Sequence, residues 1–380
     1  MKREIRQLVQ QLHDSQGRVL VVTAGAGTQA VAWLLGVAGA SRTLLEALVP
    51  YDESSFNNFL GQVPSQYVAP ETAGLLAGRA VNRAQRLFKG PDPVIGLACT
   101  ATIVTDRPKL GPHRAHICAW TAEKIVHHSL HLDKGARDRK DEEGLISRLV
   151  LNTLAEAYGL EKRLPLHLTA KDEHECRRDE VGQASRRLLQ SQKGFFSITA
   201  DGLLGETTNG AAILPGAFNP LHQGHTALSQ VAAEELQKDV IFELTAINAD
   251  KPPLADYQVL GRLLQFAGRY PVLVSAGPTF LTKARLFPGT TFVIGYDTAA
   301  RILQPHYYGG RQDQMLAALA EIRERRCDFL VAGRSDDNGR FHEASDLRVP
   351  DSLDDLFRPL PGSRFRHDIS SSAIRSGISS

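Results

Sequence analysis

His222 and His225 are three residues apart, where a short apolar segment gives way to a predicted helix. Residues 211–214 predict a buried strand, a Pro-Gly pair ends it, and a helix is expected from about Gln223. The three-residue spacing puts both imidazole rings on one face of the first helical turn. Backbone N–H groups and the helix dipole favour a phosphate at such a turn, and Gly216 would let a nucleotide approach closely. We therefore expect a phosphate site, although two histidines at this spacing can also serve only to cap a helix.

The whole segment around these histidines, I-L-P-G-A-F-N-P-L-H-Q-G-H at 213–225, resembles the signature of the nucleotidyltransferase superfamily that includes the nicotinamide mononucleotide adenylyltransferases. A second segment, H-D-I-S-S-S-A-I-R-S-G at 367–377, resembles the family's I-S-S-T-x-I-R block, with Ser372 in place of threonine. The serines would begin a helix, and Arg375 would lie one turn further on the same side. Helix N–H groups, hydroxyls and a forked guanidinium together could hold a polyphosphate.

The second half of the chain alternates between predicted strands and predicted helices. This alternation predicts a Rossmann-like α/β domain, with a parallel sheet, crossover helices on both faces and ligands at the carboxyl ends of the strands. Strands are expected at 211–217, 240–247, 272–276, 291–295 and 328–332, and helices near 223–236, 256–268, 279–286, 298–303 and 311–325.

Two further motifs follow predicted strands. T-F-V-I-G-Y-D ends in a G-x-D pattern at Gly295 and Asp297. The family uses this aspartate to hydrogen-bond a ribose, and Asp297 could also cap a helix. The loop N-A-D-K-P-P at 248–253 resembles a family loop whose lysine, here Lys251, meets the acceptor nucleotide. A single exposed lysine in a Pro-rich loop often has no such role.

The resemblance implies in-line nucleotidyl transfer, in which a phosphate oxygen of a mononucleotide attacks the α-phosphate of a nucleoside triphosphate and pyrophosphate leaves. No protein nucleophile is needed, because positioning and charge stabilisation lower the barrier, and Mg²⁺ is the implied cofactor. The implied catalytic residues are His222, His225 and Arg375. The implied nucleotide-binding residues are Gly216, Ala217, Phe218, Asn219, Gly224, Gly295, Asp297, Ser370, Ser371 and Ser372.

ATP and nicotinamide or nicotinate mononucleotide are the expected substrates, because F-N-P at 218–220, rather than F-D-P, is typical of the adenylyltransferases that make NAD. Those enzymes often stack the pyridine ring on a tryptophan, whereas Trp33 and Trp120 both lie in the first half. Three other aromatic residues could take that place: Phe280, Tyr307 and Tyr308. A cytidylyl- or pantetheine-phosphate-type transferase stays open, as does a non-catalytic nucleotide-binding regulator.

The first half begins with a formal dinucleotide fingerprint, in which a strand at 18–23 runs into G-A-G-T-Q-A at 25–30 and Glu46 lies about twenty residues on. The six-residue pattern alone is weak evidence. A longer resemblance, over roughly residues 5–160, is to the C-terminal domain of CinA, which in active members deamidates nicotinamide mononucleotide. It rests on T-A-G-A-G-T-Q-A, G-A-S-R-T-L-L-E-A-L-V-P-Y, V-A-P-E-T-A-G-L-L-A-G-R-A-V and a strand-turn-strand unit at 95–120.

This half departs from the CinA pattern at the positions that carry the chemistry. Ala24 and its neighbours leave no nucleophile where the family has a serine, although Thr28 lies nearby. Tyr51 is kept, but Phe56 stands where the family has a lysine. A hydroxyl nucleophile needs an adjacent base or cation. We therefore expect an inactive, structural or ligand-sensing domain that could form a homo-oligomer, with a pyridine nucleotide deamidase as the alternative.

His127, His128 and His131 form a compact group in the sequence. His127 and His131 are expected on one face of a helix, and no acidic or cysteine ligand follows at short range. A solvated or capping role is therefore favoured over a metal site.

Composition limits the remaining possibilities. The 380 residues suggest two domains, and an excess of only two positive charges gives no reason to expect nucleic acid or a membrane as a partner. The longest apolar run, 94–104, is too short to span a bilayer, and the four cysteines are scattered, so a cytoplasmic protein is expected.

The domain organisation expected from the sequence has three parts. These are a CinA-like domain at 1–165, a polar connecting segment at 166–205 and a nucleotidyltransferase domain at 206–380. Within the connecting segment, 171–187 is expected as a solvated helix or mobile linker, and 195–199 as a strand that closes the first domain. The two halves are expected to be separable.

Overall fold

The structure is a computed structural model that describes residues 1–107, 110–247, 252–336 and 340–366. The chain folds into two compact units and passes between them repeatedly. The first unit comprises Met1–Gln183, Ile198–Leu204 and Leu263–Tyr270. The second comprises Ala184–Ser197, Gly205–Arg262 and Pro271–Ser380.

The first unit is built on a six-stranded sheet of order β2-β1-β3-β4-β5-β6. β1 pairs in parallel with β2 and β3, and the pairs from β3 to β6 are antiparallel. β1 is apolar and almost wholly buried, as expected for a parallel strand covered on both faces. The strands are β1 (Arg18–Ala24), β2 (Leu44–Leu48), β3 (Val94–Thr102), β4 (His113–Trp120), β5 (Ile125–Leu132) and β6 (Glu173–Asp179).

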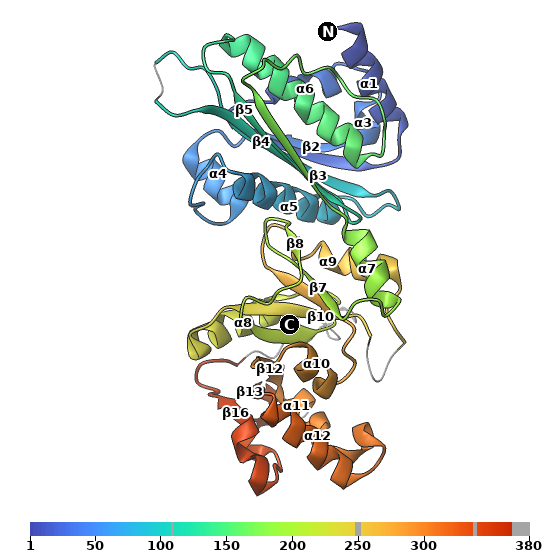
Figure 1. Ribbon diagram of the computed structural model, residues 1–380, viewed down its shortest axis with the longest axis vertical. Coiled ribbons are helices and arrows are strands. Elements are labelled where there is room, and N and C mark those ends of the chain that lie inside the picture. The colour runs from blue at the N-terminus through green and yellow to red at the C-terminus, as the bar shows by residue number, and fades with distance from the viewer. Residues whose placement is uncertain (108–109, 248–251, 337–339, 367–380) are drawn as a thin grey trace. The chain divides into compact units, whose positions relative to one another are not determined.

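Helices cover both faces of this sheet (Figure 1). One face packs against α1 (Arg3–Asp14), α2 (Thr28–Leu35) and α6 (Arg139–Ala157), which share an apolar core with the strands. The other face packs against α5 (Pro70–Leu87), which approaches β3 so closely that a Cβ at Gly96 would lie 2.1 Å from the carbonyl oxygen of Ala77. The short helices of this unit are α3 (Ala40–Thr43) and α4 (Glu53–Leu60).

Two expectations for the first half are wrong. His127, His128 and His131 lie on β5, not on a helix, because this segment forms an antiparallel hairpin with β4. Residues 173–179, expected as a helix of solvated charges or a linker, form the edge strand β6. Its side chains are mostly exposed and many are charged, so the sequence lacks the apolar pattern of a strand. Its backbone nevertheless pairs with β5 along seven residues.

The second unit is a doubly wound α/β structure. Its eight-stranded sheet has the order β16-β13-β12-β9-β10-β11-β7-β8, and the strand pairs from β16 to β11 are parallel. The chain extends from β9 through β10 to β11 on one side, then returns to β12 on the other side of β9. The topological switch point, where open α/β sheets bind ligands, therefore lies between β9 and β12.

The strands and helices expected in the second half are confirmed. The strands are β9 (Ala212–Gly216), β10 (Val240–Thr245), β11 (Val272–Ser275), β12 (Thr291–Gly295) and β13 (Asp328–Ala332). The helices are α8 (Gln223–Leu236), α9 (Asp256–Leu263), α10 (Phe280–Leu286), α11 (Tyr296–Ile302) and α12 (Gln312–Glu324). The short edge strand β16 (Phe357–Leu360) was not expected, because its sequence F-R-P-L contains a proline.

The remaining elements are two strands at one edge of the second sheet and short segments between the larger elements. They are α7 (Val181–Leu189), β7 (Phe195–Ile198), β8 (Leu204–Gly205), β14 (Arg334–Ser335), β15 (Phe341–His342) and three short 3₁₀ helices, η1 (Pro305–Tyr308), η2 (Ala344–Asp346) and η3 (Asp351–Leu356). β7 is the strand expected at 195–199, but it belongs to the second sheet and does not close the first unit. Among the described residues, no helix is long and apolar enough to cross a membrane.

Candidate functional site

The loop between β9 and α8 is held by an aromatic residue beneath it. Phe218 is buried, has a positive φ of 43°, and packs its ring 5.0 Å from the His225 ring and 5.5 Å from that of Phe242. A Cβ at Gly216 would lie 2.7 Å from the Phe218 ring. Glycine is therefore needed at 216 so that Phe218 can fold under the loop. Asn219 is exposed at the tip of the loop and precedes a cis peptide bond to Pro220.

His222 and His225 lie together at the start of α8. Their rings stack with centroids 3.7 Å apart and an interplanar angle of 28°. His222 is the N-cap residue, and its backbone N–H donates to Nδ1 of His225 over 3.3 Å. The capping function considered from the sequence is thus present. Gly224 is buried between the two histidines.

His225 is a neutral imidazole in the folded protein. Burial, with a smaller contribution from the charge of His222, lowers the pKa of His225 from 6.5 to about 4. Because Nδ1 of His225 accepts the hydrogen bond from His222, the proton of the neutral ring lies on Nε2. His225 can therefore offer an N–H donor at neutral pH without carrying a charge.

Gly295 is the last residue of the central strand β12, and Asp297 follows the strand. Gly295 is the N-cap of α11, so the suggestion that Asp297 caps this helix is wrong, because the helix begins one residue earlier, at Tyr296. Asp297 lies in the first turn, and its Oδ2 is 2.6 Å from Nη1 of Arg334. Both side chains are about half exposed, with 56% and 48% of their surface accessible, so this carboxylate can be reached by a ligand.

A cavity of about 320 Å³ lies at the carboxyl ends of the strands. Its wall includes Gly216 and Ala217, which belong to the loop that leads to the two histidines. The three aromatic residues named from the sequence as possible ring-stacking residues all line it: Phe280, Tyr307 and Tyr308. The other lining residues are Pro215, Thr245, Pro278, Thr279, Lys283, Thr298, Arg301 and Ile302. The cavity therefore combines an aromatic wall with a small number of polar groups.

A buried ion pair that the sequence did not reveal borders this cavity. Nζ of Lys283 lies 2.5 Å from Oε1 of Glu243 and 3.0 Å from Oγ1 of Thr245. The hydroxyl of Ser275 also donates to Oε1 of Glu243, over 2.5 Å. Lys283 is 3% exposed and Glu243 0%. The available signal was a glutamate inside the otherwise apolar strand V-I-F-E-L-T, which must find a partner when the strand is buried.

Several of the expected site residues lie outside the described part of the chain. They are Lys251, which follows β10 in the sequence, and, near the end, Ser370, Ser371, Ser372 and Arg375. The expectation that these serines and Arg375 hold a polyphosphate therefore stays a prediction.

In the first unit, the loop after β1 is closed by a carboxylate from α6. Glu143 accepts hydrogen bonds from the N–H of Gly27 over 3.0 Å, the N–H of Gln29 over 2.9 Å and the hydroxyl of Thr28 over 3.0 Å. These are the donors that a bound phosphate or a reacting oxygen would need. The acidic residue of the formal dinucleotide fingerprint, Glu46, is paired with Arg83 at 2.6 Å.

The positions where the CinA pattern has functional residues are occupied differently here. Phe56 is buried and makes an edge contact with the Tyr67 ring, with centroids 5.2 Å apart, so an apolar contact replaces the expected cation. Tyr51 is 70% exposed. Thr28, the hydroxyl considered as a substitute nucleophile, donates to Glu143.

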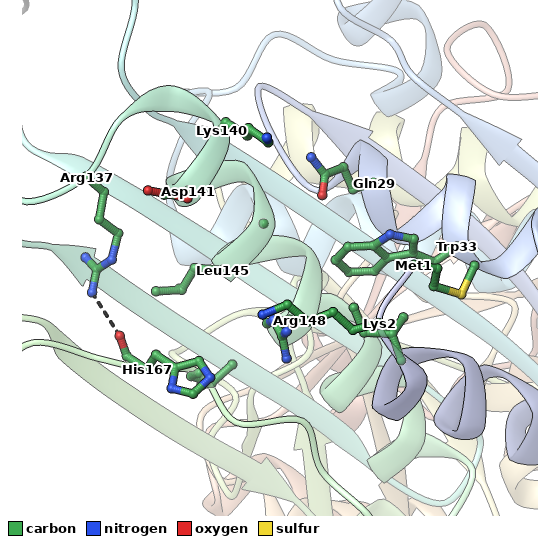
Figure 2. A pocket seen from close by; sticks show the side chains of 13 residues that line it. Met1, Lys2, Gln29, Trp33, Arg137, Lys140, Asp141, Leu145, Arg148 and His167 are labelled. Carbon is green, nitrogen blue, oxygen red and sulfur yellow. Dashed lines mark hydrogen bonds between the residues drawn. The ribbon is translucent and has the colours of Figure 1, made fainter.

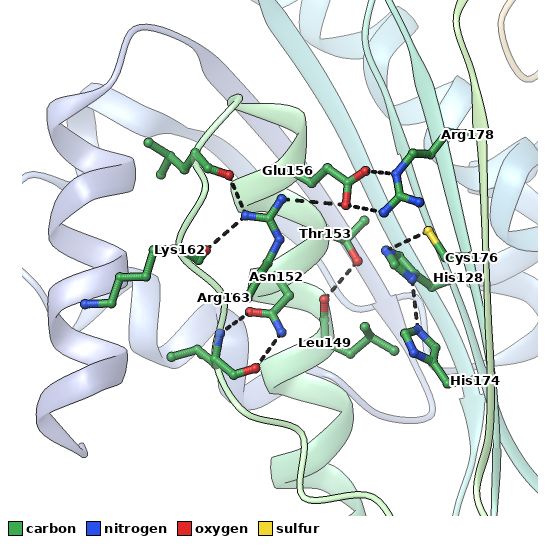
Figure 3. A network of polar contacts seen from close by, with 12 residues as sticks. His128, Leu149, Asn152, Thr153, Glu156, Lys162, Arg163, His174, Cys176 and Arg178 are labelled. Atoms are coloured by element: carbon green, nitrogen blue, oxygen red, sulfur yellow. Dashed lines mark hydrogen bonds and ion pairs between the residues drawn. The ribbon is translucent and has the colours of Figure 1, made fainter.

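His128 of β5 is part of a hydrogen-bonded network in the sheet (Figure 3). Nδ1 of His128 is 3.0 Å from Nε2 of His174, and Sγ of Cys176 is 3.8 Å from Nε2 of His128. Burial, followed by the charge of His174, lowers the pKa of His128 to about 4. Among the described residues, no group of three or more His, Cys, Asp or Glu is arranged to hold a metal ion.

A second cavity, of about 540 Å³, lies in the first unit beside α1, α2 and α6 (Figure 2). Trp33 lines it together with Lys2, Lys140 and two arginines. Arg137 is paired with Asp172 at 2.5 Å, and Arg148 with Glu4 at 2.8 Å. Internal carboxylates thus offset much of the positive charge of this cavity.

Comparisons with known proteins divide the chain at about its middle. Residues 213–377 match the family described as cytidylyltransferase-like. The N-terminal half matches solved structures of the CinA superfamily. A competence/damage-inducible protein of Agrobacterium tumefaciens is 17% identical, with 43% of this chain and 98% of that chain covered and a TM-score of 0.33. A CinA superfamily protein of Klebsiella pneumoniae is 11% identical, with 41% and 96% covered and a TM-score of 0.33. No curated protein matches the chain.

Proposed function

We propose that the second unit transfers an adenylyl group from ATP to the phosphate of a mononucleotide, such as nicotinamide or nicotinate mononucleotide, with release of pyrophosphate. One observation carries this proposal. The loop that ends in the stacked pair His222 and His225 also forms, through Gly216 and Ala217, part of the wall of an aromatic cavity. A phosphate-contacting turn beside a ring-binding cavity suits a reaction between two nucleotides.

The residues of the turn suit phosphoryl chemistry that needs no covalent intermediate. ATP would enter as its Mg²⁺ complex, with the metal held mainly by phosphate oxygens and water. His225, neutral and with its proton on Nε2, would donate to an oxygen of the α-phosphate as negative charge builds there. The N-terminus of α8 adds the positive end of a helix dipole. Asp297, exposed at the end of β12, would accept a hydrogen bond from a ribose hydroxyl.

The ring of the acceptor would lie in the cavity. Phe280, Tyr307 and Tyr308 provide aromatic surface, and burial raises the pKa of Tyr308 to about 12, so its phenol stays protonated. Arg301, also in the wall, would attract the acceptor phosphate. Ring and phosphate together favour a mononucleotide acceptor with a flat, stackable base.

A second candidate is transfer of a cytidylyl group to another phosphate acceptor, including pantetheine phosphate. The match of residues 213–377 to a family described as cytidylyltransferase-like favours it. The two candidates share the histidine turn and differ in the base of the triphosphate and in the acceptor.

The test is pyrophosphate release by the full chain, with ATP or CTP and each of three acceptors: nicotinamide mononucleotide, nicotinate mononucleotide and phosphopantetheine. We expect release with ATP and a pyridine mononucleotide, and none without an acceptor. Release only with CTP would replace the proposal with the second candidate. Binding of ATP without release for any acceptor would make the domain a nucleotide-binding regulator.

A further inference from the structure

The side chain of Lys283 lies between the buried Glu243 and the cavity. Its Nζ contacts Oε1 of Glu243 and Oγ1 of Thr245, and its side chain also lines the cavity. Glu243 receives two further side-chain donors, from Ser275 and Thr245. The carboxylate is thus well satisfied inside the sheet, and the lysine is the member of the pair that borders open space.

Stability alone gives little reason to keep this pair. Removing two charges from water costs several kcal/mol per ion, and well-packed apolar residues often replace a buried pair without loss of stability. An ammonium has three N–H donors, of which the contacts to Glu243 and Thr245 use two. The third is available to a molecule in the cavity.

The surroundings of Lys283 define what that molecule presents. Pro215, Pro278, Phe280, Ile302 and Tyr308 make much of the wall apolar or aromatic. A flat ring fits such a wall, and an oxygen attached to the ring could accept the third N–H of Lys283. Because Glu243 balances the lysine charge, the group recognised can be either a neutral carbonyl or a carboxylate.

We propose that Lys283 is a specificity-determining residue that donates a hydrogen bond to an oxygen substituent on the acceptor ring. The proposal rests on the function proposed above and narrows the acceptor to a ring that carries a carboxamide or a carboxylate. Glu243 and Thr245 act as positioning residues that fix the ammonium at the cavity.

The experiment compares three probes that differ only at the ring: nicotinamide mononucleotide, nicotinate mononucleotide and the mononucleotide of unsubstituted pyridine. Their affinities are measured by calorimetry with the full chain and with the double variant Lys283→Met/Glu243→Gln. Methionine keeps the volume of the lysine stem, and glutamine keeps an oxygen for Ser275. Glu243→Gln alone is the matched control, because it retains the lysine side chain and its N–H donors.

The wild-type chain should bind at least one substituted probe about 10- to 100-fold more tightly than the unsubstituted one, the range for a hydrogen bond from a charged donor. The double variant should lose that preference, whereas ATP affinity stays unchanged. Comparing nicotinamide with nicotinate mononucleotide then identifies the substituent.

Two results would overturn the proposal, and the first does not depend on the double variant. One is a wild-type chain that binds substituted and unsubstituted probes equally. The other is a folded double variant that weakens all three probes by the same factor, because a purely structural lysine would do that. A wild-type chain that binds no mononucleotide and releases no pyrophosphate would instead refute the proposed function, so the two failures are distinguishable.

Discussion

The hydroxyl of Thr28 donates a hydrogen bond over 3.0 Å to Glu143, a residue of α6 more than a hundred positions away in the chain. The same carboxylate accepts from the N–H groups of Gly27 and Gln29. An internal anion thus occupies the start of α2, where the sequence suggested a nucleotide fingerprint and where the CinA pattern has its nucleophile.

We therefore expect no deamidation by the first unit. Thr28 is the one hydroxyl that sequence analysis offered as a substitute nucleophile, and its partner Glu143 also accepts from the backbone N–H groups of Gly27 and Gln29, so these donors are not available to a reacting oxygen. Ala24 and Phe56 stand where the serine and lysine are expected. The measurement is ammonia released from nicotinamide mononucleotide by the full chain. A rate of even roughly 1 s⁻¹, ordinary for an enzyme, would contradict the prediction.

Glu143→Gln should destabilise the first unit without affecting the second. Glutamine retains one acceptor oxygen but brings an NH₂ group toward backbone N–H donors, so at least one buried donor loses its partner. The cost is about 1–3 kcal/mol in free energy of unfolding, measured by denaturant titration. Glu161→Gln, at an exposed position, is the control. An unchanged midpoint for Glu143→Gln would show that the three hydrogen bonds contribute little.

Much of the second unit could be predicted, because its buried parallel strands are apolar runs separated by Gly and Pro. β6 could not be predicted, since this edge strand has the sequence E-H-E-C-R-R-D and shows no apolar face. The histidines were identified from a motif, whereas the three aromatic residues of the cavity were named only as possible substitutes for a tryptophan. Lys283 was not identified from the sequence, because F-L-T-K-A-R-L looks like an ordinary surface helix. Its partner Glu243 is forty residues earlier, and only the folded structure brings the two side chains together.

The assignment of Leu263–Tyr270 to the first unit changes the expectation for a truncated protein. The side chain of Asn82 donates to the carbonyl oxygens of Leu264 and Gln265, at 3.2 and 2.9 Å. A fragment beginning at Thr199 loses these partners and also β7, whose Phe195 packs 4.8 Å from the Phe287 ring. We expect it to melt well below the full chain or to aggregate. An equal melting temperature would show that the fragment needs neither the contact with Asn82 nor β7.

Acid should destabilise the fold through His225. Its pKa is about 4 in the folded chain and near 6.5 when unfolded, so the unfolded state binds a proton more readily between these values. The stability that depends on a neutral His225 is complete above about pH 6.5 and is lost as the pH falls toward 4. The check is the stability difference between wild type and His225→Gln, measured from pH 7.5 to 4.5, which should shrink on acidification. The exposed His306→Gln serves as control, and a pH-independent difference for His225→Gln would contradict the buried, neutral state.

His225→Gln should also separate catalysis from binding. The neutral N–H of His225 is expected to strengthen its hydrogen bond as charge develops on the transferring phosphoryl oxygens, more than in the ground state. Loss of one such preorganised donor typically lowers turnover by about 10²–10³-fold. Because this interaction forms mainly in the transition state, kcat should fall far more than ATP affinity, which calorimetry measures independently. His222→Gln is the matched comparison. His222 is the N-cap residue, and its backbone N–H donates to Nδ1 of His225. The substitution retains this N–H group. If His225→Gln releases pyrophosphate at the wild-type rate with a good acceptor, the histidine turn is not the catalytic centre.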